Sequence, residues 1–81
     1  MERSNILNIM NLVLQNKGRA PITDEAQSTR DALFRSLDFS ETALRIEGQI
    51  GRELVFDAVS MRRIEKIGDV LDFFEQLTRA E

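Results

Sequence analysis

An apolar stripe in the middle of the chain constrains its fold most strongly. The apolar residues recur at i, i+4, i+7 and i+11, namely Phe39, Ala43, Ile46 and Ile50. This is the spacing of one face of an α-helix, and Gly51 follows at a position where helices commonly end. The pattern predicts a helix that starts at Ser36, with Ser36 as its N-cap, and that packs its apolar face into the core.

Two further stripes predict helices on either side. The first helix is expected to have Ser4 as its N-cap and to end between Asn16 and Gly18. Its apolar residues with helical spacing are Ile6, Ile9, Met10 and Val13. The last helix is expected to open at Asp69. Its predicted buried face consists of Val70, Phe73, Phe74 and Leu77.

A short third helix is expected between these elements. Asp57 or Ser60 can cap it, and it would contain Met61 and Ile64. The run at residues 55–56 alone has strand character, and one short run cannot make a sheet.

The remaining segment is a polar loop. Residues 19–32 carry no clean apolar period, which predicts a long first loop with a helical turn near residues 24–27. The expected fold is therefore all-α. We expect one domain, residues 1–81, built as a small four-helix bundle with three longer helices and one short third helix.

The composition excludes several kinds of chemistry. The chain has no cysteine and no histidine, which excludes thiol catalysis, serine–histidine triads and zinc sites built from these residues. A core this small cannot enclose paired carboxylates in a deep pocket, so we expect no enzyme. Because no disulfide can form, a reducing compartment is favoured, and we expect a cytoplasmic monomer.

Membranes and nucleic acids are not expected partners. No segment approaches the roughly 20 apolar residues that cross a bilayer, and asparagines interrupt the apolar run at residues 6–14, which argues against a secretory signal. The net charge is −3, and residues 36–81 hold ten acidic and six basic side chains. Such a balance repels a phosphate backbone, and we interpret Arg62, Arg63 and Lys66 as a solvated face.

A set of residues at helix starts and ends carries a resemblance to a known family. These residues are Ser36, Leu37, Asp38, Glu41, Ile50, Gly51, Ile64, Ile67, Gly68 and Asp69, followed by apolar positions to Leu77. In these positions the chain resembles the acyl carrier proteins, whose signature is a serine in a Gly-x-Asp-Ser-Leu loop at the start of the second helix. The resemblance covers about residues 30–77.

The resemblance implies a function and a cofactor. A phosphopantetheinyl transferase would esterify Ser36 with 4′-phosphopantetheine from coenzyme A, and the thiol of this arm would carry acyl groups as thioesters. The other implied partners are acyl-loading and acyl-processing enzymes such as a ketosynthase or an acyltransferase. The implied pathway makes a specialised polyketide, a fatty acid or another secondary metabolite. A helix N-terminus suits the phosphodiester, because its unpaired N–H groups favour negative charge.

Two alternatives stay open. The chain could be a peptidyl carrier that is loaded with an amino acid. It could also be a non-modified helical interaction module, in which Ser36 is only a helix cap and exposed leucines dock a partner helix.

Some residues depart from the family pattern. Arg35 replaces the aspartate that usually precedes the modified serine, and we expect it either to contact the phosphate or to select a dedicated transferase. Leu33 replaces the expected glycine. Lys66 stands where the family often has a threonine.

The expected partner-binding residues lie on the second and third helices. They are Leu37, Asp38, Glu41, Leu44 and Met61. Met61 either touches a stored acyl chain or packs in the core. Arg45 reduces the acidity of the second helix, so electrostatic steering of partners should be weak and tolerant of salt. Leu37 and Leu44 are then expected to carry more of the recognition.

Overall fold

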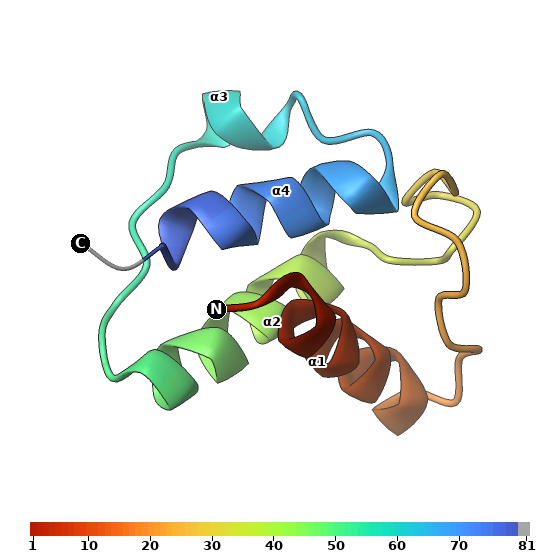
Figure 1. The fold of residues 1–81 in the computed structure, drawn as a ribbon. Coiled ribbons are helices and arrows are strands. Elements are labelled where there is room, and N and C mark those ends of the chain that lie inside the picture. Colours follow the sequence, from red (N-terminus) through yellow and green to blue (C-terminus); the bar gives the residue numbers. More distant parts are fainter. Residues whose placement is uncertain (80–81) are drawn as a thin grey trace.

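The described part of the chain contains four helices. The structure is a computed structural model, and it describes residues 1–79. The helices are α1 (Arg3–Asn16), α2 (Ser36–Ile50), α3 (Ala58–Met61) and α4 (Ile67–Leu77) (Figure 1). Residues 1–79 form no strand, and an isolated antiparallel bridge joins Ser28 and Lys66. The predicted all-α class is confirmed. No helix within the described residues is both long and apolar enough to cross a membrane.

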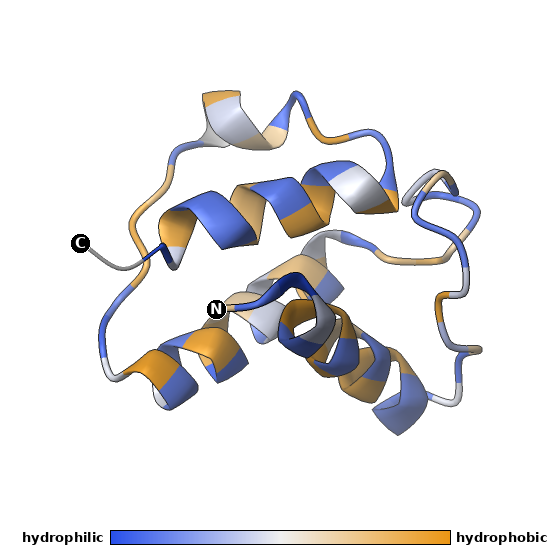
Figure 2. Ribbon diagram, viewed as in Figure 1, coloured by the Kyte–Doolittle hydropathy of each residue, from blue (hydrophilic) through white to orange (hydrophobic). Residues whose placement is uncertain are grey.

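The core lies between α1, α2 and α4. Figure 1 shows α4 running above α1 and α2, with α3 on the outer side of α4. Apolar residues of α4 lie on the side that faces the other two long helices (Figure 2). The fully buried apolar side chains are Ile6, Met10, Val13, Leu14, Ile46, Ile67, Val70, Leu71 and Phe74. The predicted stripes supply most of this core, and Leu71 adds a residue that the predicted face of α4 left out.

Phenylalanines fix the first half of α2 against α4. Phe39 stacks on Phe74 with ring centroids 4.9 Å apart, and its ring centroid lies 5.4 Å from that of Phe73. Phe56, from the segment after α2, meets Phe39 edge-on at 5.7 Å. Aromatic pairs of this kind add stability beyond the area that they bury.

The start of α1 differs from the prediction. The helix begins at Arg3, so Ser4 lies inside it and is not its N-cap. The carbonyl of Glu2 already accepts hydrogen bonds from the N–H groups of Asn5 and Ile6, at 3.0 and 3.1 Å. The helical hydrogen bonds therefore begin before the serine.

The start of α4 also lies earlier than predicted. This helix begins at Ile67, two residues before Asp69. The Asp69 carboxylate accepts a hydrogen bond from the backbone N–H of Lys66 at 2.9 Å. Asp69 thus caps the helix from its third position, as the acidic member of a capping box does, rather than from a position outside it.

The short helix α3 ends before its predicted end. Asp57 caps it, since the Asp57 carboxylate accepts from the N–H of Ser60 at 2.9 Å. The helix ends at Met61, and Ile64 lies beyond it. The N–H of Ile64 donates to the carbonyl of Met61, three residues back, at 3.1 Å. This spacing belongs to a tight turn and not to an α-helix.

The long first loop, residues 17–35, is fastened to the start of α4. The carbonyls of Glu25 and Gln27 accept hydrogen bonds from the N–H groups of Gly68 and Ile67, both at 2.9 Å. In Figure 1 the loop passes this end of α4. The loop therefore satisfies the first backbone donors of α4, which a helix leaves without internal partners.

Ion pairs around Arg3 tie the same loop to two helices. The Arg3 guanidinium lies 2.6 Å from Glu25 in the loop and 2.6 Å from Asp72 in α4, and it also pairs with Glu75. The expected turn at residues 24–27 is present, closed by a 3.1 Å backbone hydrogen bond. These contacts give the loop one defined path from α1 to α2.

Candidate functional site

Ser36 is the first residue of α2, and it is exposed. Its hydroxyl makes no hydrogen bond to the described residues, so it is not the N-cap that the sequence predicted. Arg35 occupies the cap position, and its backbone N–H donates to the Asp38 carboxylate at 2.8 Å. A carboxylate in the first turn has thus taken over the capping role, and the serine hydroxyl is left available.

The first backbone donors of α2 are available as well. The N–H groups of Ser36 and Leu37 form no hydrogen bond with the described residues, whereas the loop covers the equivalent donors of α4. Unpaired donors at a helix start favour a negatively charged group. The start of α2 therefore combines a free hydroxyl with a setting suited to an anion.

Asp38 is buried, and its charge is balanced inside the protein. Its side chain is only 1% exposed. One carboxylate oxygen accepts from Lys17 at 2.5 Å, and the other accepts from Arg19 at 2.6 Å. The expectation that Asp38 contacts partners is therefore wrong, because capping the helix draws the side chain inward, beneath the two cations.

These contacts also fix the charge states. Burial alone raises the pKa of the Asp38 carboxyl. Hydrogen bonds from Lys17, from the backbone N–H of Arg35 and from Arg19 outweigh this effect and hold that pKa below its ordinary value. The pKa of Lys17 is raised by its hydrogen bonds to Asp38 and Glu41. The carboxylate and the ammonium group are consequently both charged at neutral pH.

The turn before Ser36 has an unusual backbone. Among the non-glycine residues that the structure describes, Leu33 alone has a positive φ, at 58°. The left-handed region costs a residue with a Cβ atom about 1–2 kcal/mol. Arg19 donates to the Leu33 carbonyl at 2.9 Å, and the N–H of Phe34 donates to the carbonyl of Thr29 at 2.9 Å. These bonds hold the turn that leads the chain into α2.

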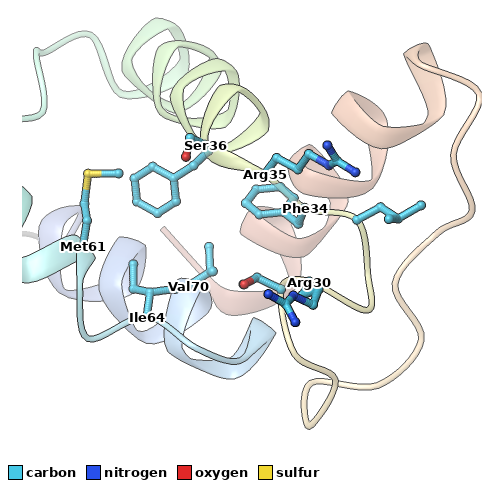
Figure 3. Close-up of a pocket in the computed structure, with 10 residues that line it drawn as sticks. Arg30, Phe34, Arg35, Ser36, Met61, Ile64 and Val70 are labelled. Carbon is cyan, nitrogen blue, oxygen red and sulfur yellow. The ribbon is translucent and has the colours of Figure 1, made fainter.

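A groove of about 460 Å³ adjoins Ser36, and we call it the Ser36 groove. Its lining residues are Thr29, Arg30, Leu33, Phe34, Arg35, Ser36, Phe39, Met61, Ile64 and Val70. Figure 3 shows the Ser36 hydroxyl at one edge of the groove, with Met61, Ile64 and Val70 along its other sides. Both the volume and the mainly apolar lining are typical of small-molecule sites.

Two residues with predicted ligand contacts line this groove. Met61 is half-buried and also packs against the core, so its packing role is confirmed and its position suits contact with a ligand. Arg35 is exposed, and its guanidinium extends away from Ser36 in Figure 3. Contact between Arg35 and a phosphate on Ser36 would require this side chain to rotate.

The outer face of α2 carries two exposed leucines, Leu37 and Leu44. Leu37 is 74% exposed and Leu44 is 66% exposed. Glu41 is half-buried and pairs with Lys17 at 2.8 Å. Of the partner contacts predicted on α2, the two leucines are exposed, and Glu41 is partly neutralised by Lys17.

No protein-family model, curated protein or solved structure matches this chain. No carboxylate lines the Ser36 groove, and among residues 1–79 no cluster of side chains is placed to hold a metal ion. The Ser36 hydroxyl has no hydrogen-bonded base among the described residues, of the kind that activates a serine nucleophile. It can, however, receive a group that another enzyme transfers.

Several residues of the site were missed in the sequence. Lys17 and Arg19 follow α1 directly and carry no apolar period, yet they neutralise Asp38 from about 20 positions away. Arg30 and Phe34 belong to a polar loop without a clear pattern, and both line the groove. A basic pair just beyond a predicted helix is the one signal that could have revealed the first two.

Proposed function

We propose that this chain is an acyl carrier protein, which carries acyl intermediates as thioesters on a 4′-phosphopantetheine arm attached to Ser36. The observation that carries the proposal is the start of α2. There the free Ser36 hydroxyl lies beside unpaired backbone N–H groups and at the edge of an apolar groove. Such a position suits a serine that another enzyme modifies with a phosphodiester.

The backbone of Leu33 supports the same proposal. The carrier signature has glycine at this position, three residues before the serine. Glycine adopts a positive φ without steric cost, whereas leucine does not. Leu33 nevertheless has a φ of 58°. The chain thus keeps a turn that glycine favours, although it lacks the glycine.

The charges around Ser36 are compatible with an added phosphodiester. The nearest carboxylate on α2, that of Asp38, would repel it if it were unpaired. Lys17 and Arg19 neutralise that carboxylate. Arg35 adds a positive charge that no ion pair within residues 1–79 engages. Arg35 itself stands where carriers usually have an aspartate before the serine.

The proposal includes the finer fold, the partners and the setting. The helices would form the four-helix bundle of a carrier, working as a cytoplasmic monomer. A phosphopantetheinyl transferase would modify Ser36, and a ketosynthase or an acyltransferase would act on the cargo in a specialised polyketide, fatty-acid or related pathway. In the modification, the Ser36 oxygen bonds to the β-phosphorus of coenzyme A, adenosine 3′,5′-bisphosphate leaves, and a transferase base takes the serine proton.

A second candidate function has one observation in its favour. Leu37 and Leu44 are exposed on one face of α2, as in a helix that docks a partner without any modification. The chain would then be a helical interaction module, and Ser36 would stay unmodified.

An intact-mass measurement separates the two candidates. The protein is incubated with coenzyme A and several phosphopantetheinyl transferases, including a promiscuous one. We expect a mass gain of one phosphopantetheine in the wild type, none in Ser36→Ala, and an unchanged gain in Ser40→Ala. Ser40 is the matched control, since it is a second exposed serine on α2. No gain with any transferase, or a gain that survives Ser36→Ala, would reject the carrier.

A further inference from the structure

The Ser36 groove has one sign of charge. Its ten lining residues include two arginines, Arg30 and Arg35, and no aspartate or glutamate. Neither arginine forms an ion pair with the described residues. Other basic residues nearby differ, because Lys17 and Arg19 are both engaged by Asp38. The groove therefore has two positive charges that no ion pair among the described residues engages.

The arrangement of these residues suits an amphiphilic ligand. Phe34, Phe39 and Val70 are buried apolar residues of the lining. Arg30 comes from the first loop and lies on the other side of the groove from Ser36 in Figure 3. A hydrocarbon chain that enters the groove at its Ser36 edge can thus cover the apolar lining and end at the guanidinium.

We propose that the Ser36 groove prefers an acyl chain with a terminal carboxylate, which Arg30 binds. Arginine presents paired N–H donors that match a carboxylate, and the exposed side chain of Arg30 can turn toward one. This inference rests on the proposed function only in assuming that the chain is tethered at Ser36.

The absence of cysteine makes a direct test possible without any transferase. In Ser36→Cys the new thiol is the only one in the chain, so a thiol-reactive arm attaches at a single site. Three arms of equal length carry an eight-carbon chain that ends in a methyl, a carboxylate or an ammonium group. Nuclear magnetic resonance then follows the methyl signal of Met61 and the side-chain N–H signal of Arg30.

The carboxylate arm should shift both signals, and the methyl arm should shift the Met61 signal alone. The ratio of bound to free arm should be up to about fivefold higher for the carboxylate arm, as expected for an accessible ion pair. The ammonium arm should bind least. Added salt should reduce the difference between the carboxylate and methyl arms.

Two arginine variants serve as a matched pair. Arg30→Gln should remove the preference for the carboxylate and leave binding of the methyl arm unchanged. Arg45→Gln changes an exposed arginine of α2 that does not line the groove, and it should change nothing. Equal binding of the carboxylate and methyl arms, or a preference that survives Arg30→Gln, would overturn the inference. Because the arms are attached chemically, this result is independent of whether a transferase modifies the native serine.

Discussion

The helices α2 and α4 begin with the same pattern but in different surroundings. In each, a basic residue stands at the cap and an aspartate three positions later accepts its backbone N–H, at 2.8 Å for Arg35 with Asp38 and 2.9 Å for Lys66 with Asp69. The loop then covers the next donors of α4 and leaves those of α2 unpaired. The same cap is therefore found at two helix starts. The loop covers the start of α4, whereas the backbone donors of α2 are available to an incoming group.

The two aspartates also differ in what surrounds their carboxylates. Asp38 is buried and held by Lys17 and Arg19. Asp69 is half-buried and receives backbone N–H groups without an ion pair among the described residues. Side-chain ion pairs with Asp38 thus stabilise the start of α2, whereas backbone hydrogen bonds with the loop stabilise the start of α4. Substitutions at the two positions should separate these two kinds of support.

The largest effect is expected from Asp38→Ala. This change leaves two cations without their buried partner and removes the cap, which should lower the free energy of unfolding by about 3 kcal/mol. A domain of this size has only about 3–5 kcal/mol in total, so the variant should be close to unfolding. Urea denaturation measures the loss. Asp69→Ala is the matched control, with an expected loss of about 1 kcal/mol for a cap alone. Equal losses would contradict the contrast between the two starts.

The change of the free energy of unfolding at acid pH should reveal part of the stabilisation that Asp38 provides. Because folding lowers the pKa of Asp38, its contribution is present above the unfolded pKa of about 3.9 and is lost as the pH falls through the folded value. In Asp38→Asn, stability should therefore decline less steeply than in the wild type below about pH 4. Urea midpoints at a series of pH values measure both slopes.

The pKa of Asp69 is lowered too, by the backbone N–H groups of Lys66 and Glu65. Asp69→Asn should therefore also reduce the slope of the free energy of unfolding against pH. The double variant should show the sum of the two reductions. An unchanged slope in Asp38→Asn would mean that the buried carboxylate contributes nothing to acid unfolding.

A smaller effect is expected at the turn before α2. Leu33→Val should cost about 1 kcal/mol, because a β-branched side chain fits a positive φ less well than leucine does. Leu33→Gly should cost nothing or stabilise slightly, since its side chain is 46% exposed and little packing is lost. Thermal denaturation of both variants provides the comparison. If glycine were the more damaging substitution, packing of Leu33 and not its backbone would control this turn.

The helices could be predicted because their signals are local. The stripe from Phe39 to Ile50 predicts α2 and its end at Ile50, and Gly51 follows with a φ of 74°. The capping residues could not be predicted with the same success. Ser36 and Asp38 are both suitable capping residues within one turn, and the choice between them depends on Lys17 and Arg19, which lie far away in the sequence.

Ser36 could be predicted as the centre of the candidate site, but the groove residues around it could not. Ser36 stands at a helix start that the sequence indicates by itself. The lining of the groove combines Arg30 and Phe34 from the loop with Met61 and Val70 from the other end of the chain. Only tertiary packing brings these segments together, so no spacing in the sequence predicts that they are neighbours.

Locating a modification within α2 tests the central claim most directly. After incubation with coenzyme A and a promiscuous transferase, trypsin should release residues 36–45, because arginine precedes this segment and also ends it. Fragmentation mass spectrometry of this peptide distinguishes Ser36 from Ser40. We predict one phosphopantetheine, on Ser36 alone. A peptide that stays unmodified, or that carries the group on Ser40, would contradict attachment at Ser36.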